Sequence, residues 1–399
     1  MTSDFNSVQS GQRVHIGFFG STNSGKSSLI NAIAGQDVSI VSDVKGTTTD
    51  PVHKAMELLP IGAVMLYDTA GLDDDTELGA QRTAKTFGIL RHTDIAVMVI
   101  DKDENIKPSH KELMKRIKDK GIPNIIVYTK CDKGHPAKKL MGNSVCVSAH
   151  TGENIHELKL LIAKVYLEST AYKKPKPLIE DMVTRESIVI LVTPVDEAAP
   201  KGRLILPQVQ TIRAALDSHA VCMTVQPEEL AFALGQLKNE PKLVITDSQA
   251  FGRIKDIVPE HIPLTSFSIL MARFKGTFDW SYEGIKALRK LRDGDTVLIS
   301  EGCTHHRQCG DIGTVKLPAA VRRIAGCDVQ FEFTSGGSFP EDLGRYSLVI
   351  HCGGCMLNAM EMEYRRSLSE RQNVPFTNYG MVLAEASGIL ERSISFIKR

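Results

Sequence analysis

One short segment constrains the fold of this chain more than any other. The residues from Gly20 to Ser27 read GSTNSGKS, which fits G-x-x-x-x-G-K-[ST], between the apolar run VHIGFFG and the helical pattern SLINAIAG. In such a loop the glycines let backbone N–H groups wrap around phosphates, and the helix that follows adds a favourable dipole. We expect Lys26 to reach the β- and γ-phosphates and Ser27 to hold Mg²⁺. The plain alternative is a glycine-rich turn without a ligand.

The segments around this loop have the rhythm of an α/β domain. Apolar runs typical of short strands alternate with helix-length segments up to about residue 172; the runs are VHIGFFG, AVMLYDT, IAVMVID, NIIVYTK and SVCVSA. This alternation predicts βαβ units around a mostly parallel sheet, the setting in which a phosphate-binding loop is found.

Two further motifs supply contacts to the metal and to the γ-phosphate. The run GTTTD at residues 46–50 offers hydroxyls in a loop, and Thr48 can close onto Mg²⁺ in the triphosphate state. Asp68 ends the run AVMLYDT, and its carboxylate can hold the metal, while the N–H of Gly71 can meet the γ-phosphate. We therefore expect Ser27, Thr48 and Asp68 to form the magnesium site.

The base is read by residues that follow two later strands. Thr129, Lys130, Cys131 and Asp132 end the run NIIVYTK, and the carboxylate of Asp132 can accept two parallel hydrogen bonds from guanine that adenine cannot donate. Backbone N–H groups at Ser148 and Ala149 can bind the guanine oxygen. A lone T-K-x-D is common on protein surfaces, but its place after a strand favours GTP. Cys131 is interpreted as a filler without chemistry of its own.

These motifs together predict a GTPase. The expected catalytic residues are Asn23, Lys26, Thr48, Asp68 and Gly71. The residues expected to bind the nucleotide are Gly20, Ser21, Asn23, Ser24, Gly25, Lys26, Ser27, Ser28, Thr48, Asp68, Gly71, Thr129, Lys130, Asp132, Ser148 and Ala149.

Length and composition set the wider frame. A chain of 399 residues is too long for one ordinary core. The charged, proline-containing stretch at residues 173–177 predicts a linker, so we expect an α/β fold with an N-terminal P-loop GTPase (Ras-like) domain, 1–172, followed by two smaller α/β domains, 178–263 and 264–399.

Charge and hydropathy limit the environment and the partners. A net charge of +1 gives no electrostatic reason to expect nucleic acid or an anionic membrane. The first twenty residues lack the pattern of a signal peptide, and no run of eighteen apolar residues occurs. We therefore expect a cytoplasmic protein.

The last quarter of the chain carries a cluster of cysteine and histidine residues. Cys303 and His305 follow the strand-like run TVLIS, and His351, Cys352 and Cys355 follow YSLVI. Because the carboxyl ends of parallel strands share one edge of a sheet, these sets can converge and bind a metal. Three thiolates suit a 4Fe-4S cluster with one open iron, and three thiolates plus one histidine suit zinc; the spacing alone fits both. His305 and His351 are candidate fourth ligands.

The other cysteines and histidines give a weaker indication of function. His306 and Cys309 are ambiguous, and Cys146, Cys222 and Cys327 are each interpreted as a small buried apolar side chain.

Up to about residue 172 the sequence resembles the GTPases of the Era and tRNA-modification (TrmE-like) group. That group has an asparagine in its phosphate loop, here Asn23, and a G-T-T-R-D switch in which Thr49 replaces the arginine; Thr129 replaces the usual asparagine of N-K-x-D. The resemblance implies that Asn23 helps bind a potassium ion. Leu72 stands where Ras-like GTPases have a water-orienting glutamine, so we expect slow intrinsic hydrolysis, stimulated by potassium or a partner.

The whole chain resembles the HydF family, the maturation GTPases of FeFe hydrogenases, because CTHH at Cys303 and HCGGC at His351 occur together with the central domain. The resemblance implies domains for GTP binding, dimerisation and cluster binding, with a 4Fe-4S cluster on Cys303, Cys352 and Cys355. It also implies a homodimeric scaffold that carries a transient di-iron subcluster precursor from radical-SAM maturases to the FeFe-hydrogenase apoprotein.

Two other functions remain as alternatives. One is a ribosome- or tRNA-associated Era-like GTPase with a structural zinc domain, which needs a basic face; the near-zero net charge speaks against it. The other is a redox-sensing GTPase in which the cluster gates hydrolysis.

Overall fold

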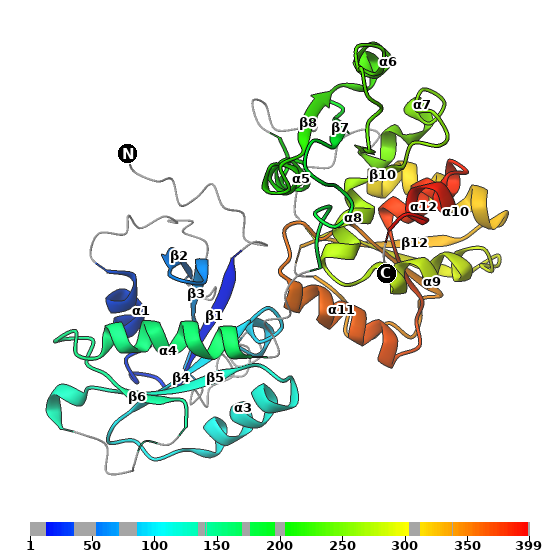
Figure 1. Ribbon diagram of the computed structural model, residues 1–399. Helices are drawn as coiled ribbons and strands as arrows, with labels where there is room; N and C mark the ends of the chain where they lie inside the picture. Colours follow the sequence, from blue (N-terminus) through cyan, green and yellow to red (C-terminus); the bar gives the residue numbers. More distant parts are fainter. Residues whose placement is uncertain are drawn as a thin grey trace. The chain divides into compact units, whose positions relative to one another are not determined.

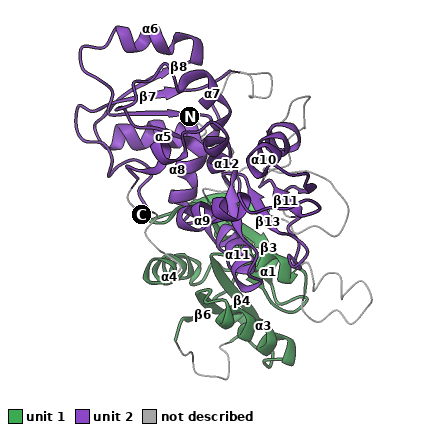
Figure 2. Ribbon diagram, turned by 90° about the vertical axis from the view of Figure 1, so that its right-hand side faces the viewer, with its two compact units in different colours: residues 1–174 green, residues 175–399 purple. Residues whose placement is uncertain are grey.

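The computed structural model describes residues 13–35, 53–71, 86–134, 140, 142–169, 176–195, 204–302, 312–336 and 338–397. Figure 1 shows their helices and strands. The chain divides into two compact units, residues 1–174 and 175–399, coloured separately in Figure 2. The division falls inside the stretch 173–177, where the sequence predicts a linker.

The first unit is built on a six-stranded sheet in the order β2-β3-β1-β4-β5-β6. Only β2 is antiparallel to its neighbour. The strands are β1 (Val14–Phe19), β2 (His53–Leu58), β3 (Gly62–Asp68), β4 (Ile95–Asp101), β5 (Asn124–Thr129) and β6 (Ser144–Cys146). Its α-helices include α1 (Lys26–Ala34), α3 (Pro108–Asp119) and α4 (Ile155–Glu168).

The sequence explains the middle of this sheet. Every residue of β1 is buried, and so are the first six of β4, as expected for near-continuous apolar strands with helices on both faces. In α4 the buried Ile155, Leu158 and Ile162 follow the spacing of one helix face.

The second unit contains two four-stranded parallel sheets. The first, in the order β10-β9-β7-β8, consists of β7 (Ile188–Val192), β8 (Val221–Val225), β9 (Leu243–Thr246) and β10 (Leu264–Ser266). The second, in the order β12-β11-β13-β14, consists of β11 (Thr296–Ser300), β12 (Gln330–Thr334), β13 (Leu348–His351) and β14 (Phe376–Asn378). The α-helices are α5 (Leu206–Asp217), α6 (Leu230–Gly235), α7 (Phe251–Ile254), α8 (Phe267–Phe274), α9 (Phe278–Leu288), α10 (Leu317–Ala325), α11 (Ala359–Arg371), α12 (Tyr379–Ala386) and α13 (Leu390–Ile394).

These two sheets share one topology. In each, the first strand in sequence lies between the second and the third, and the fourth lies beyond the third. In each, the fourth strand runs directly into a helix whose N-cap side chain accepts a backbone N–H: Ser266 caps α8, and Asn378 caps α12. The two sheets with their following helices are therefore a structural repeat.

One hydrophobic core serves both sheets. Buried residues of one continuous cluster come from β7, β9 and β10 as well as from β11 and β13. The strand β10 pairs with β9, so the expected boundary between residues 263 and 264 separates two strands of one sheet. Because β10 has only three residues and leads straight into α8, its sequence carries no pattern that shows which sheet it joins.

The expected fold class, α/β with an N-terminal domain built around the phosphate-loop motif and further α/β structure after it, agrees with these sheets and helices. Among the described residues, no helix is both long and apolar enough to span a membrane.

Candidate functional site

The phosphate loop joins β1 to α1. Gly25, the N-cap of α1, has φ 91°, a left-handed conformation that glycine adopts without strain. At Gly20 a Cβ atom would run into the carbonyl oxygen of Val99 on β4. The two glycines therefore allow the loop to fold tightly against the sheet and to open onto the N-terminus of α1, which favours an anion.

Several predicted ligands of the phosphates and of the metal meet at this loop. The buried Lys26 donates from Nζ to the carbonyl oxygens of Gly20 (3.1 Å) and Ser21 (2.7 Å). Ser27 Oγ donates to Asp68 Oδ2 at 2.5 Å, so the hydroxyl and the carboxylate expected to bind Mg²⁺ are adjacent. Thr48 lies outside the described residues.

Gly71 also lies against the phosphate loop. A Cβ atom on Gly71 would collide with Thr22, so the loop after β3 approaches the phosphate loop closely. Asn23 and Ser28 are exposed, and Asn23 has φ 59°. Its side chain is thus accessible for an ion or a nucleotide.

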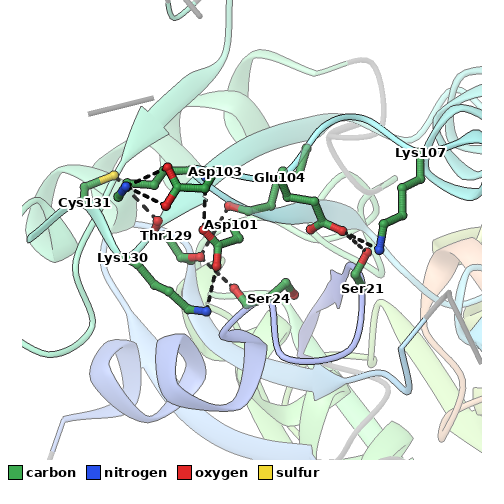
Figure 3. A network of polar contacts seen from close by, with 11 residues as sticks. Ser21, Ser24, Asp101, Asp103, Glu104, Lys107, Thr129, Lys130 and Cys131 are labelled. Carbon is green, nitrogen blue, oxygen red and sulfur yellow. Dashed lines mark hydrogen bonds and ion pairs between the residues drawn. The ribbon is translucent and has the colours of Figure 1, made fainter. Parts of the chain in front are cut away.

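The hydroxyl of Ser21 is engaged elsewhere. It donates to Glu104 Oε1 at 2.7 Å and lies 2.9 Å from Nε2 of the buried His110, so only the backbone of Ser21 is left for a phosphate. Figure 3 shows Ser21 and Glu104 in this network, together with Lys107, which pairs with Glu104 at 2.8 Å. Burial raises the pKa of Glu104, but the hydrogen bonds from Lys107 and Ser21 outweigh it and hold that pKa below its ordinary value.

The segment predicted to recognise the base is tied to the phosphate loop. Thr129 Oγ1 donates to the carbonyl oxygen of Ser24 at 2.7 Å, and Lys130 pairs with Asp101 at 2.6 Å (Figure 3). The side-chain hydroxyl of Thr129 therefore links the end of β5 to the loop before α1, although the usual asparagine is missing.

Asp132 and Ser148 form the polar end of the site. Ser148 Oγ donates to Asp132 Oδ1 at 2.8 Å, and this hydrogen bond is the largest cause that holds the pKa of Asp132 below its ordinary value. Asp132 is exposed, and its ionised carboxylate can accept the two N–H groups of guanine. Ala149 follows directly and is half-buried.

A disulfide joins Cys131 to Cys146, with 6.1 Å between the Cα atoms. The sequence suggested unreactive, small side chains at both positions, and that interpretation is wrong for this pair. Because Cys131 precedes Asp132 and Cys146 ends β6 just before Ser148, the bond connects the two segments that are predicted to read the base.

The second candidate site lies at the carboxyl ends of β11 and β13. These strands are parallel neighbours, with Ser300 opposite His351, and the strand order reverses between them. Such a reversal opens the crevice in which parallel α/β sheets bind ligands. Cys352 Sγ accepts the backbone N–H of Gly302 (3.0 Å) and that of Gly354 (3.4 Å), so the segment before Cys303 meets the C-G-G-C loop.

The predicted cluster ligands are only partly described. Cys303, His305, His306 and Cys309 lie outside the described residues, and within the described part no three metal-binding side chains form a site. Cys352 and Cys355 are both half-buried; burial raises the pKa of Cys355, and the Lys275 ammonium opposes that shift.

The residues present fit an iron–sulfur cluster. Two backbone N–H groups directed at the Cys352 sulfur favour a thiolate there. A third cysteine follows Gly302 in sequence, which supplies the donor set of three thiolates.

His351 is fully buried among polar partners. Its Nε2 lies 2.9 Å from Arg365 Nη1, and its Nδ1 lies 2.7 Å from the carbonyl oxygen of Cys352. Burial, and then the Arg365 charge, lower the pKa of His351 to about 3, so the ring is neutral near pH 7.

Sequence reasoning missed several residues at these sites, namely Asp101, Glu104, His110 and Arg365. Glu104 and His110 lie 83 and 89 residues from Ser21, which they contact, and Asp101 pairs with Lys130 on a different strand end. An isolated charged residue carries no signal of such a contact. His110 had a weak local signal, since it follows Pro108 at the start of α3 and receives the backbone N–H of Lys107.

Three family models match the chain in series. The 50S ribosome-binding GTPase model matches residues 15–130, the hydrogen maturase F dimerization domain matches 178–276, and the hydrogen maturase F tetramerization domain matches 279–396.

The similar curated proteins share the GTPase region. GTPase Der from Helicobacter hepaticus is 31% identical over 193 residues, covering 44% of this chain and 39% of that protein. The tRNA modification GTPase MnmE from Rhizobium etli is 36% identical over 152 residues, covering 37% of this chain and 32% of that protein. The chain thus spans well under half the length of these relatives.

Among solved structures, Era from Aquifex aeolicus aligns at 21% identity and a TM-score of 0.33, covering 53% of this chain and 93% of that one. The G domain of FeoB from T. maritima aligns at 24% identity and a TM-score of 0.30, covering 38% and 98% respectively.

Proposed function

Since this chain has the architecture of the hydrogen maturase F family, a GTPase domain followed by that family's dimerization and tetramerization domains, we propose that it is a GTP-hydrolysing scaffold for FeFe-hydrogenase maturation. In this role it holds a 4Fe-4S cluster, receives the di-iron subcluster precursor from radical-SAM maturases as cargo, and delivers it to the hydrogenase apoprotein.

The observation that carries this proposal is the contact between Gly302 N–H and Cys352 Sγ at 3.0 Å. It joins the segment that leads into Cys303 to the loop that carries Cys352 and Cys355, at the point where the strand order reverses. Three cysteine ligands hold three irons of a cubane and leave the fourth iron accessible, which suits a carrier better than a closed structural site does.

The GTPase site serves as the switch in this proposal. Ser27, Asp68 and Thr48 hold Mg²⁺, while Lys26 and the N–H of Gly71 contact the terminal phosphate. The side chain of Leu72 has no polar atom that could orient the attacking water, so intrinsic hydrolysis is slow. A potassium ion bound at Asn23 accelerates it. Nucleotide state then regulates the docking and release of partners.

The domains that match the family's dimerization and tetramerization models support oligomerization. We infer that the homodimer contact lies at β8, which is an edge strand of its sheet and carries the exposed Val221. Leu216 on α5 and Phe232 on α6, in the segments that flank β8 in sequence, are exposed as well.

The cluster is tested by iron and sulfide analysis and by EPR of anaerobically prepared, reduced protein, comparing wild type with Cys303→Ala. A cubane spectrum with equal iron and sulfide that is lost in the variant supports the scaffold. Zinc without iron or sulfide overturns it and favours an RNA-associated GTPase with a structural metal domain. Turnover of GTP that changes with the oxidation state of the cluster favours redox gating instead.

The GTPase assignment has its own test. Hydrolysis is measured in sodium and in potassium buffers for wild type and Asn23→Ala. Stimulation by potassium in wild type alone supports the role of Asn23, and equal rates in both buffers contradict it. Asn31→Ala, which changes an exposed asparagine of α1 outside the phosphate loop, is the matched control.

A further inference from the structure

A fully buried arginine lies behind the cysteine loop. Arg365 on α11 donates from Nε to Glu361 (2.7 Å), from Nη1 to His351 Nε2 (2.9 Å) and to Ser300 Oγ (3.3 Å), and from Nη2 to the carbonyl oxygen of Gly336 (2.7 Å). A buried cation is tolerated only when its donors are paired, and this one is paired by segments that end β11 and β13.

These contacts fix the tautomer of His351. A guanidinium only donates hydrogen bonds, so Nε2 of His351 is the acceptor toward Arg365 and carries no proton. The proton is therefore on Nδ1, which donates to the carbonyl oxygen of Cys352. Neither ring nitrogen has a lone pair left for an iron, and the arginine charge lies on the side where a metal would bind.

His351 in turn helps to fix Cys352. The backbone N–H of Cys352 donates to Ser300 (3.0 Å), its carbonyl oxygen accepts from His351, and its sulfur accepts from Gly302 and Gly354. This cysteine is thus held at its amide, its carbonyl and its sulfur. Partners of this kind orient a ligand before the metal arrives.

We propose that Arg365 is a positioning residue of the cluster site, and that His351 transmits its effect to Cys352 and is not itself an iron ligand. The proposal rests on the proposed function, because it concerns the cluster that Cys303, Cys352 and Cys355 hold. The fourth iron is then left to His305 or to an exchangeable ligand from outside the chain.

The test uses the reconstituted full-length protein, as wild type, Arg365→Gln and His351→Asn. The matched control is Arg366→Gln, the next residue on α11, which pairs with the more exposed Glu363 and Glu370. The readouts are the rate of iron release to a chelator and pulsed EPR of protein carrying ¹⁵N-labelled histidine. GTP binding by each variant confirms that the first unit is folded.

We expect both variants to take up a 4Fe-4S cluster and to lose iron about tenfold faster than the control, as is typical when the partner of a metal ligand is removed. If the EPR spectrum of wild type shows a hyperfine coupling between the cluster and a histidine ¹⁵N nucleus, we expect the same coupling in His351→Asn. Coupling that disappears in His351→Asn and survives in Arg365→Gln overturns the proposal, as do release rates equal to the control.

A second variant covers the case in which Arg365→Gln does not fold. Glu361→Gln weakens the anchor of Arg365 while keeping the cation; iron release faster than in Arg366→Gln supports the proposal, and an equal rate contradicts it. A wild type without any cluster overturns the proposed function and this inference together, whereas a normal cluster with unaffected variants overturns the inference alone.

Discussion

Thr129 connects the two loops that we expect to contact opposite ends of a nucleotide. Its hydroxyl donates to the Ser24 carbonyl oxygen at 2.7 Å, although its neighbours in sequence belong to the base-recognition segment. We predict that Thr129→Val weakens GTP binding by about tenfold, because the carbonyl oxygen loses its donor at a cost of about 1–2 kcal/mol.

Thr129→Asn keeps a donor at this position and should bind GTP nearly as wild type does. Titration with a fluorescent GTP analogue measures both variants. Equal affinity of wild type and Thr129→Val would show that the link between the loops is not needed.

The lowered pKa of Asp132 predicts how GTP affinity depends on pH. Because the Ser148 hydrogen bond lowers that pKa, the carboxylate stays ionised even somewhat below its ordinary pKa. The proposed interaction with guanine is therefore lost only as pH falls through the lowered value. In Ser148→Ala the pKa returns upward, so GTP affinity should begin to fall at a higher pH. Binding is measured from about pH 7 down to about pH 3, a range that includes the ordinary aspartate pKa of about 3.9.

The control for this experiment is Asp132→Asn, whose affinity should be weak and independent of this titration. Identical pH profiles for wild type and Ser148→Ala would contradict the role of the hydrogen bond.

At the residue scale, local motifs were predictable and distant partners were not. The spacing of Gly20, Lys26 and Ser27 indicated their neighbourhood because a phosphate loop is one continuous segment. The disulfide between Cys131 and Cys146 depends on the pairing of β5 with β6, which the residue types alone do not give. The sequence did not indicate the role of Arg365 either, because arginine is nearly always exposed unless it has buried partners, and those partners are distant in sequence.

At the scale of elements, β8 is the clearest open edge. Its Val221 N–H donates to Ser187 beside β7, and since the direction of the amides alternates along a strand, the amide of Thr224 faces away from β7. We predict that Thr224→Pro abolishes the proposed dimer, because proline removes an outward donor and leaves the inner hydrogen bonds intact. Light scattering coupled to gel filtration measures the mass.

Two other variants make this test specific. Thr224→Val keeps the amide and should remain dimeric, whereas Met223→Pro removes an inward amide and should destabilise the sheet itself. A Thr224→Pro protein that keeps the mass of wild type would exclude this edge as the interface.

The sequence predicted where strands begin and end better than it predicted which strands pair with each other. The run TVLIS predicted β11 residue for residue, because a continuous apolar run bounded by polar residues is typical of a buried strand. The sequence did not show to which sheet β10 belongs, because the pairing of this strand is decided by packing across the whole second unit.

At the scale of the whole molecule, the second unit is two copies of one topology closed around one core. The helices that follow their last strands, α8 and α12, contact each other, and Asn378 Nδ2 donates to the Ser268 carbonyl oxygen across that contact. The copy with β11 and β13 carries the cysteine loop at its point of strand reversal. Its rigidity therefore depends on a core that both copies share.

Gly380 on α12 tests this dependence. A Cβ atom there would lie 2.9 Å from Ser268 Cβ and 3.1 Å from the backbone nitrogen of Ile269, so an added methyl must push α8 and α12 apart. We predict that Gly380→Ala destabilises residues 175–399 as one cooperative body by about 1–3 kcal/mol. The unfolding temperature of these residues should fall by roughly 2–12 °C. The unfolding temperature of residues 1–174, which GTP binding raises, should be unchanged.

Calorimetry with and without GTP separates the two transitions. The matched control is Gly252→Ala on α7, where a Cβ atom meets nothing within 4 Å and stability should be equal or slightly higher. Separate unfolding of the two sheets in Gly380→Ala would contradict the shared core, because one sheet would then survive the loss of the other.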